Sequence, residues 1–419
     1  MKNKLIILNY QRVIPPFMQT EIQIAKEIFN EIIYITPKMK LNNNGKEYVN
    51  YRNVKIVEIS NLKWYLGIIK VPFIFLRKEV LFDMVNCLKE KRFDIKLIID
   101  YIKRLNASEM LKSSVNNIIK NDTLDSSLYS ILATWFTAEA YAAAQIKCKY
   151  NNITAVSFAH SFEVDPIKNK YIDFNQNKFK HENLDNINFI SKSVYQTYKN
   201  IVMNKYYIDD RNISFRYLGC NKLFDNNNDK SDDGILRIVS CSSMIKVKRI
   251  ELILEALKEW KICKVEWTHL GDGPLMSELT EKANLIMNNN KNIKINFKGY
   301  FSNIDVHKYY ATNKCDIFIN VSSSEGLPVS LMECMAYGIP AIATNVGGTC
   351  EIVNNKNGIL LPSDVTPQIL RDAITKYWIS PDSIKDTYRK NSYNKWKESF
   401  QAYENSKKYF KKVVDYNEK

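Results

Sequence analysis

Short apolar runs alternate along the chain with longer segments whose apolar positions recur at helical spacing. The run Lys4–Leu8 is followed by Pro15-Pro16, which breaks the chain, and by Glu21–Phe29, whose apolar residues fall on one helical face. Ile32–Ile35 is a second β-branched run. Strands that alternate with amphipathic helices are typical of a parallel sheet covered by helices, so the opening of the chain predicts an α/β fold.

The same alternation returns after a polar interruption. Asp225–Asp233 contains no apolar residue and predicts a linker, with a domain boundary near residue 225. Before it, the region from Val54 to about Tyr150 has a mostly helical pattern, and Thr154–Phe158 is a further candidate strand. After it, we expect strands at Arg237–Cys241, Val265–Leu270, Ile293–Phe297, Asp316–Val321 and Ala341–Ala343, and helices at Ile250–Lys258, Leu275–Met287, Asp305–Thr312 and Pro328–Tyr337. Two α/β domains are therefore predicted.

Glycines concentrate in the second domain. Only 12 occur in the chain, and eight of them fall between residues 271 and 358. Three predicted strands are followed directly by loops of this kind: Gly271-Asp272-Gly273-Pro274, Gly299-Tyr300, and Ser322-Ser323-Ser324-Glu325-Gly326-Leu327-Pro328. Ligands of open parallel sheets bind beyond the carboxyl ends of the strands, where glycine lets backbone approach them closely. We therefore expect these loops to line one binding site.

Two carboxylates stand eight residues apart across the last of these loops. Glu325 lies in the loop and can reach a ligand hydroxyl, whereas Glu333 lies in the helix that follows and could contact a second part of the ligand, such as a ribose. The free backbone N–H groups of Val329, Ser330 and Leu331, in the first helical turn, form an anion site suited to a diphosphate.

Composition narrows the class of protein. The 419 residues predict two or three domains, and 45% apolar with 25% charged residues excludes bulk disorder and fibrous structure. The net charge of +15 favours an anionic partner: phosphate groups, an acidic membrane face or nucleic acid. The eight cysteines include no Cys-x-x-Cys pair, which favours neither a zinc site nor a disulfide scaffold and suits a reducing cytosol. No apolar stretch reaches 18 residues, so we expect a cytoplasmic protein, soluble or peripheral to the membrane.

The apolar run Trp64–Leu76 allows two interpretations. It is bracketed by Lys63-Trp64-Tyr65 and Arg77-Lys78, and residues 54–120 carry an excess of Lys and Arg. Aromatic and basic flanks suit the interface of an anionic leaflet. A buried helix whose ends extend their charged tips to solvent fits the same pattern equally well.

A longer constellation resembles a known family. The segments that carry the resemblance are Ser324-Glu325-Gly326-Leu327-Pro328, Glu333 to Pro340, Gly347-Gly348, Glu351-Ile352-Val353, Gly271 to Pro274, and Ser243–Leu257. Together they resemble the signature of family 4 retaining glycosyltransferases (glycosyl transferases group 1), over most of residues 235–365. The resemblance implies the GT-B fold, with two Rossmann-like domains facing across a cleft. It further implies an acceptor-side domain at 1–224, a nucleotide-sugar-binding domain at 225–395, and a helix at 396–419 that crosses back to the first domain.

Roles for individual residues follow from the resemblance. Glu325, with the backbone of Gly326 and Leu327, would contact the donor sugar, and Glu333 would bond the nucleotide ribose. Lys248 sits where the family has a lysine on the donor diphosphate. Ser243 stands where the family usually has an arginine, so Lys246 or Arg249 would add positive charge there. Gly271, Asp272, Gly273, Gly299, Tyr300, Val329, Ser330 and Leu331 complete the predicted donor site.

In the first half, His160 follows the strand Thr154–Phe158 and matches a family histidine that reaches the donor sugar from the opposite domain. The sequence contains no Asp-x-Asp triplet to hold a divalent ion, so we predict no metal and no resident cofactor. A lysine and helix N–H groups would stabilise the leaving diphosphate instead.

The predicted function is retaining transfer of a sugar from a nucleotide diphosphate sugar, by default a UDP-sugar, to a glycan or lipid-linked acceptor in surface polysaccharide biosynthesis. A sugar-nucleotide epimerase or a phosphorylase would use the same fold. A basic nucleic-acid-binding protein is a third interpretation of the +15 charge, but the chain has no zinc module, helix-turn-helix signature or aromatic–basic RNA motif to support it.

Overall fold

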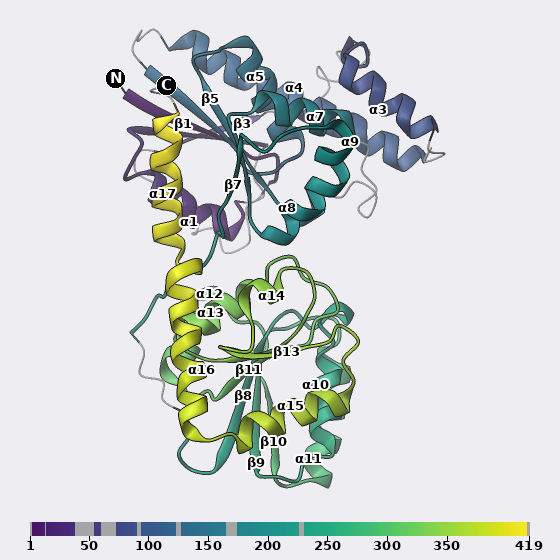
Figure 1. The fold of residues 1–419 in the computed structure, drawn as a ribbon, viewed down its shortest axis with the longest axis vertical. Coiled ribbons are helices and arrows are strands. Elements are labelled where there is room, and N and C mark those ends of the chain that lie inside the picture. The colour runs from purple at the N-terminus through teal and green to yellow at the C-terminus, as the bar shows by residue number, and fades with distance from the viewer. Residues whose placement is uncertain are drawn as a thin grey trace. The chain divides into compact units, whose positions relative to one another are not determined.

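The computed structural model describes residues 2–12, 14–37, 54–59, 73–89, 94–122, 127–164, 174–225 and 230–416. The chain divides into two compact units. Unit 1 comprises Met1–Tyr217 together with Tyr403–Lys419, and unit 2 comprises Leu218–Ala402 (Figure 1). Each unit contains one parallel sheet with interleaved helices, so the prediction of two α/β domains is confirmed.

Unit 1 has a seven-stranded sheet in the order β3-β2-β1-β4-β5-β6-β7. Its strands are β1 (Lys2–Leu8), β2 (Glu31–Pro37), β3 (Val54–Ile59), β4 (Ser127–Ala133), β5 (Thr154–Ala159), β6 (Asn186–Phe189) and β7 (Ile213–Phe215). Its helices are α1 (Pro16–Ala25), α3 (Lys78–Lys89), α4 (Ile95–Asn121), α5 (Ala138–Lys149), α6 (Ser161–Val164), α7 (Phe174–Asn183), α8 (Lys192–Tyr198), α9 (Asn204–Tyr206) and α17 (Ala402–Asp415), with a π-helical turn at Lys199–Met203.

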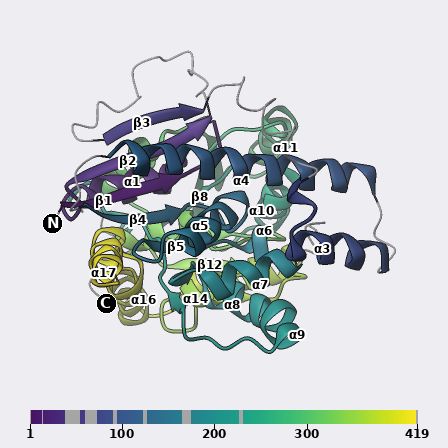
Figure 2. The same ribbon diagram turned by 90° about the horizontal axis from the view of Figure 1, so that it is seen from above.

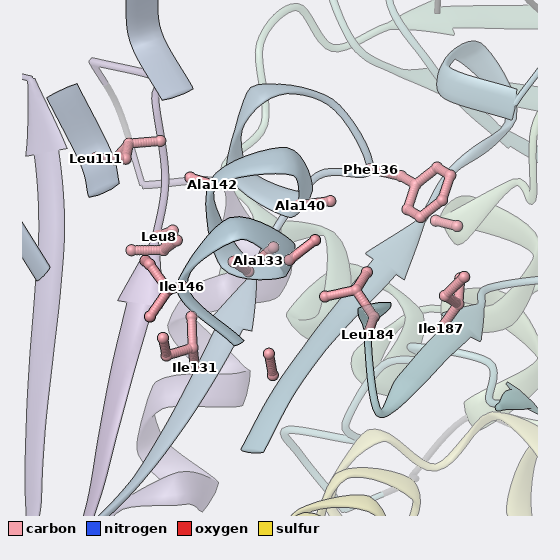
Figure 3. Packing of buried hydrophobic residues seen from close by; sticks show 14 of the residues in the cluster. Leu8, Leu111, Ile131, Ala133, Phe136, Ala140, Ala142, Ile146, Leu184 and Ile187 are labelled. Atoms are coloured by element: carbon pink, nitrogen blue, oxygen red, sulfur yellow. The ribbon is translucent and has the colours of Figure 1, made fainter. Parts of the chain in front are cut away.

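The alanine-rich helix α5 packs on one face of this sheet. Alternate residues of β1 and β4, among them Leu8 and Ile131, point to the same face and are fully buried. Ile146 of α5 lies beside Leu8 and Ile131, and Ala140 and Ala142 belong to the same buried cluster, as Figure 3 shows. Because alanine adds little bulk, the helix axis can approach the strands closely at their carboxyl ends, where the loops of unit 1 begin.

The last helix, α17, packs on the opposite face of the same sheet, because Phe158, which contacts it, alternates along β5 with Ala155 and Ala159 of the α5 cluster. The ring of Phe158 on β5 lies 5.6 Å from that of Tyr409 on α17. Arg216, just after β7, donates from Nη1 to Glu21 Oε1 at 2.9 Å and to Ser406 Oγ at 2.8 Å, and all three side chains are buried. A buried charge needs such partners, so this contact fixes α17 to unit 1.

Unit 2 has a six-stranded sheet in the order β10-β9-β8-β11-β12-β13. Its strands are β8 (Ile235–Cys241), β9 (Lys264–Leu270), β10 (Ile293–Phe297), β11 (Ile317–Asn320), β12 (Ala341–Thr344) and β13 (Gly358–Leu361). Its helices are α10 (Ile250–Lys258), α11 (Met276–Asn289), α12 (Asn303–Thr312), α13 (Val329–Ala336), α14 (Thr349–Ile352), α15 (Pro367–Ile379) and α16 (Asp382–Lys395), with a 3-10 turn at Lys246–Lys248 and a π-helical turn at Trp396–Phe400. Helices α10, α11 and α15 share one core with the sheet, while α12 reaches the other face, where Tyr310 contacts Phe318.

All predicted strands correspond to observed ones, but the mostly helical interpretation of Val54 to Tyr150 is wrong at two places. β3 opens this region, and β4 lies at the centre of the sheet between β1 and β5. Both faces of a central strand are covered, so β4 is an apolar run interrupted only by Ser130, which periodicity cannot distinguish from a buried helix. The predicted helix Glu21–Phe29 begins earlier, since Pro16 occupies its first turn rather than breaking the chain.

The unit boundaries also differ from those predicted. The chain passes into unit 2 after Tyr217, not near residue 225, and the described part of the polar stretch, Asp225 with residues 230–233, lies within unit 2. There the backbone N–H of Ser231 donates to Asp316 Oδ1 at 2.8 Å, and Asp233 pairs with Arg237. The return into unit 1 comes after Ala402 rather than at residue 396, because Trp396 is buried within unit 2.

Candidate active site

The topology of unit 2 predicts a ligand crevice between β8 and β11. From β8 the chain adds β9 and β10 on one side, then crosses back to add β11, β12 and β13 on the other. The loops that leave β8 and β11 therefore diverge, and the opening between them is the usual ligand site of such sheets. Lys248 follows β8 and Glu325 follows β11, so chain order alone brings these predicted residues to the same edge of the sheet.

Lys248 and Glu325 meet at this point. Lys248 Nζ lies 2.7 Å from Glu325 Oε1, and the same oxygen accepts a longer hydrogen bond of 3.3 Å from Asn320 Nδ2. The Glu325 side chain is 9% exposed and that of Lys248 is 24% exposed. A cation and a carboxylate with limited access to solvent attract each other more strongly than a surface pair does.

Arg249 has a different environment from Lys248. Its backbone is in the left-handed region, at φ 49°, which turns the chain into α10. Its guanidinium donates to the carbonyls of Val321, Ser322 and Ser363 at 2.6–3.1 Å. These bonds tie the loop after β11 to the segment after β13. Ser243 and Lys246, the other predicted positions near the diphosphate, are exposed.

The glycine turn after β9 permits two backbones to pack together. A Cβ on Gly271, at φ +141°, would lie 1.9 Å from the carbonyl oxygen of Ser242, and one on Gly273 would lie 2.6 Å from that of Met244. The N–H of Met244 donates to the carbonyl of Asp272, and Gly271 donates to that of Gly299 at 2.9 Å. Only glycine fits there, so the loops after β8, β9 and β10 form one frame. Tyr300, next to Gly299, is largely exposed.

The loop after β12 supports the Glu325 loop in the same way. A Cβ on Gly347, at φ +55°, would lie 1.9 Å from the carbonyl oxygen of Glu325. The N–H of Gly348 donates to the carbonyl of Gly326 at 2.7 Å. This close packing holds Gly326 and Leu327 against the two glycines and sets the position of the Glu325 backbone.

The N-terminus of α13 begins directly after this loop. Pro328 precedes it, and no side chain caps the helix. The prediction that Leu331 offers a free N–H is wrong, because that N–H donates to the carbonyl of Pro328 at 3.2 Å. Val329 and Ser330 are the remaining predicted donors of the first turn, where the partial positive charge of the helix terminus favours an anion.

Glu333 lies one turn further along α13 and is buried, so it is not a solvated helix carboxylate. Asn303 Nδ2, at the start of α12, donates to its Oε1 at 2.5 Å, and His307 Nε2 lies 3.8 Å from the same oxygen. Loss of solvation on burial raises the pKa of Glu333 to about 7, although the bond from Asn303 opposes that shift. The sequence analysis missed Asn303 and His307, whose four-residue spacing, which places them on one face of α12, was the available signal.

In unit 1, His160 follows β5 and lies in an aromatic cluster. Its Nε2 lies 3.3 Å from the carbonyl oxygen of Thr134, and its ring centre lies 4.5 Å from that of Trp135 and 5.3 Å from that of Phe17. Burial lowers the pKa of His160 to about 4, so the ring is neutral at pH 7. A neutral imidazole can donate or accept a hydrogen bond but supplies no positive charge.

Two buried carboxylates hold the loops around His160. Glu163 accepts the N–H of His160 at 2.7 Å and that of Phe136 at 2.8 Å, so it joins the loops after β5 and β4. Glu139 accepts the N–H of Tyr10, after β1, at 2.9 Å. Burial raises the pKa of Glu163 well above its ordinary value. The sequence analysis missed Glu139 because it did not recognise β4, the strand before it. Glu163 follows the predicted strand β5, but its backbone partners come from long-range contacts that the sequence does not display.

Among the described residues, no cluster of three or more His, Cys, Asp or Glu is suited to a metal ion. None of the helices within the described ranges is long and apolar enough to cross a membrane.

Comparison with known proteins matches residues 222–397 to the family described as glycosyl transferases group 1. The GtfA subunit of a UDP-N-acetylglucosamine–peptide N-acetylglucosaminyltransferase from Streptococcus agalactiae is 28% identical over 38% of this chain and 31% of its own length. WclY of Escherichia coli, an O-antigen biosynthesis glycosyltransferase, is 32% identical over 34% of this chain and 37% of its own length. The chain thus spans about a third of the length of these curated relatives.

Solved structures match nearly the whole chain. HepE of Anabaena, in complex with UDP, has a TM-score of 0.65 at 14% identity and covers 99% of this chain and 100% of its own. The lipopolysaccharide outer core galactosyltransferase WaaB has a TM-score of 0.63 at 13% identity, with 99% of both chains covered. At such identities the likeness concerns the fold, which is GT-B as expected from the sequence.

Proposed function

We propose that this chain, a glycosyltransferase of the glycosyl transferases group 1 family, transfers a sugar from a UDP-sugar to a glycan or lipid-linked acceptor. The transfer would retain the configuration of the sugar. The domain that matches the family comprises residues 222–397. The observation that carries the proposal is the pairing of Lys248 with Glu325 at the β8–β11 crevice, beside the uncapped N-terminus of α13. A cation, a carboxylate and helix N–H groups are the groups needed to hold a diphosphate joined to a polyhydroxylated ring.

The diphosphate is assigned to Lys248 and the first turn of α13. Negative charge builds on the leaving diphosphate as the glycosidic bond breaks, and fixed donors aimed at that charge lower the barrier. Lys246, exposed on the same 3-10 turn, is available for a second contact. With these donors the reaction needs no divalent metal, which agrees with the absence of an Asp-x-Asp triplet from the sequence.

Glu325 and Glu333 are assigned to different parts of the donor. Glu325, in the loop, would accept hydrogen bonds from the sugar hydroxyls, with Gly326 and Leu327 contributing backbone groups. Glu333, deeper along α13, would accept bonds from the ribose hydroxyls. Retention would proceed on the face of the departing diphosphate through an oxocarbenium-like state. His160 remains a predicted sugar contact, acting as a neutral hydrogen-bonding group.

The known relatives support the choice of donor and pathway. Structures of HepE were solved with UDP and with UDP-glucose, and one of the pneumococcal GtfA with UDP and GlcNAc. WclY acts in O-antigen biosynthesis, and TuaC of Bacillus subtilis is a putative teichuronic acid biosynthesis enzyme. We therefore place the chain in surface polysaccharide biosynthesis.

A thermal-shift screen over UDP-, GDP- and ADP-sugars tests the donor. A ligand present at 100 times its dissociation constant adds about 2.7 kcal/mol of stability, and we expect that response from UDP-sugars. NMR of the product with the matching acceptor then reports the anomeric configuration, with and without EDTA. An inverted product, activity that EDTA abolishes and manganese restores, or an epimerised nucleotide sugar formed without acceptor would each contradict the proposal.

A further inference from the structure

Helix α3 of unit 1 exposes large apolar side chains on its outer side. Leu81, Phe82 and Leu88 are 52%, 56% and 57% exposed. Phe73 and Leu76 in the preceding turn, and Ile95 at the start of α4, are exposed still further. We call these six residues the α3 surface. In Figure 1 and Figure 2, α3 lies at the border of unit 1, beside the N-terminal part of α4.

The fold of unit 1 does not account for the α3 surface, because the inner side of α3 already makes the packing contacts. Val80 and Cys87 are buried in a cluster with Leu97 and Tyr101 of α4. Asp83, also buried, accepts a hydrogen bond from the Tyr101 hydroxyl at 3.2 Å. A helix at a protein surface ordinarily turns polar residues outward, so several large apolar side chains on the outer side indicate a binding surface.

Charges are divided between the two sides of α3 in the same way. Both carboxylates of the helix belong to its inner side: Asp83 is buried, and Glu79 Oε1 accepts the hydroxyl of Tyr141 at 2.6 Å. Lys78 and Lys89 are exposed, one in each terminal turn. The outer side of α3 therefore combines apolar and cationic groups without a carboxylate.

An anionic bilayer fits this combination better than a second copy of the chain does. Apolar side chains enter the headgroup region, while lysines at the two ends of the helix meet lipid phosphates. Two copies that joined their α3 surfaces about a two-fold axis would oppose lysine with lysine. We propose that the α3 surface binds this protein peripherally to anionic membranes, which, building on the function proposed above, would bring it to a lipid-linked acceptor.

This surface shares only Phe73 and Leu76 with the run that the sequence predicted. Of the run Trp64–Leu76, residues 64–72 lie outside the described residues, as does Lys63. Arg77, expected to meet lipid, instead donates to Glu109 Oε1 at 2.7 Å and to Gln145 Oε1 at 2.8 Å within unit 1. The membrane contact therefore moves from Arg77 to the outer side of α3.

Vesicle flotation of the full-length protein tests the proposal. The probe is vesicles of phosphatidylcholine with 30 mol% phosphatidylglycerol, compared with phosphatidylcholine alone, at low and high salt and without any nucleotide. We expect binding to the anionic vesicles that weakens with salt. Leu81→Gln/Phe82→Gln/Leu88→Gln should lower the partition coefficient by at least about 100-fold, and Lys78→Glu/Lys89→Glu by at least about 10-fold.

The matched control is Ile262→Gln/Leu285→Gln/Ile379→Gln, which replaces three comparably exposed apolar residues scattered over unit 2 and should bind as the wild type does. Circular dichroism and the UDP thermal shift report folding and donor binding separately, so failure here is distinguishable from failure of the proposed function. Wild-type protein that ignores anionic vesicles, α3 variants that bind undiminished, or a dimer that only the α3 substitutions dissociate would each overturn the proposal.

Discussion

Lys248 Nζ and Glu325 Oε1 are 2.7 Å apart although 77 residues separate them along the chain. The pair joins the loop after β8 to the loop after β11. These are the two neighbouring strands between which the strand order of the sheet reverses. If the donor binds as proposed, its diphosphate replaces Glu325 as the partner of Lys248, and its sugar replaces Lys248 as the partner of Glu325. The ion pair thus keeps the site organised before the donor arrives.

Replacing Lys248 by alanine should lower kcat about 10²–10³-fold, the scale for losing one transition-state donor. Glu325→Gln should also lower kcat strongly while UDP binding survives, because the carboxylate is assigned to the sugar. Since the two side chains contact each other, the losses in the double variant should be less than additive. Steady-state kinetics of the four proteins measures this coupling, and fully additive losses would show that the pair does not act as a unit.

Replacing Glu333 by glutamine should weaken UDP binding yet stabilise the protein above pH 7. Burial raises the pKa of the Glu333 carboxyl in the folded state from 4.5 to about 7, so between these pH values the carboxyl is protonated in the folded state and ionised in the unfolded state. As the pH rises toward 7, the free energy of unfolding of the wild type therefore falls. At pH 8 the loss is on the order of 3 kcal/mol, and a neutral glutamine does not incur it. Melting temperatures at pH 5 and pH 8 test this, because the melting temperature of the variant should exceed that of the wild type only at pH 8.

The affinity of the wild type for UDP should depend on the same titration. An ionised carboxylate accepts hydrogen bonds from ribose hydroxyls better than a carboxylic acid does, so UDP affinity should fall as the pH drops from 8 to 6. Calorimetric titration at several pH values measures this slope, and Glu333→Gln should flatten it. An unchanged slope in the variant would assign the titration to another group.

Gly347→Ala should impair both stability and turnover. Its Cβ would lie 1.9 Å from the carbonyl oxygen of Glu325, so the Glu325 loop must move, and we expect at least a 100-fold loss of kcat. Gly234→Ala is the matched control: Gly234 also has positive φ, at +74°, but a Cβ there meets nothing within 4 Å. That control should cost about 1–2 kcal/mol of stability for the left-handed backbone and leave turnover intact.

His160 should contribute no titration to activity between pH 5 and 8, because its pKa is lowered to about 4 by burial. His160→Gln, which retains hydrogen-bonding groups, should reduce kcat about tenfold to a hundredfold, the scale of one strong hydrogen bond. Its pH–rate profile should keep the shape of the wild-type profile. A bend near pH 6.5 that disappears in the variant would show a protonated, accessible imidazole instead.

Local pattern was sufficient wherever the relevant signal lies within one element. The period of apolar residues located α10 at its observed bounds, and the glycine loops marked the carboxyl ends of β9, β10 and β11. The positions of Glu325 in a loop and of Glu333 in the helix that follows were likewise visible, since they depend on eight residues of chain. These features depend on neighbours in sequence, which the sequence displays directly.

Only the tertiary structure determined the features that depend on contacts between distant segments: strand order, side-chain partners and burial. It placed β4 at the centre of the first sheet, surrounded the Glu333 carboxyl with Asn303 and His307, and directed the guanidinium of Arg249 to backbone carbonyls. It also left Leu81, Phe82 and Leu88 exposed on the outer side of α3, where composition alone would bury them. Burial and partners are properties of long-range contacts, and a helix that is apolar on two sides does not reveal from its own residues which side the fold will cover.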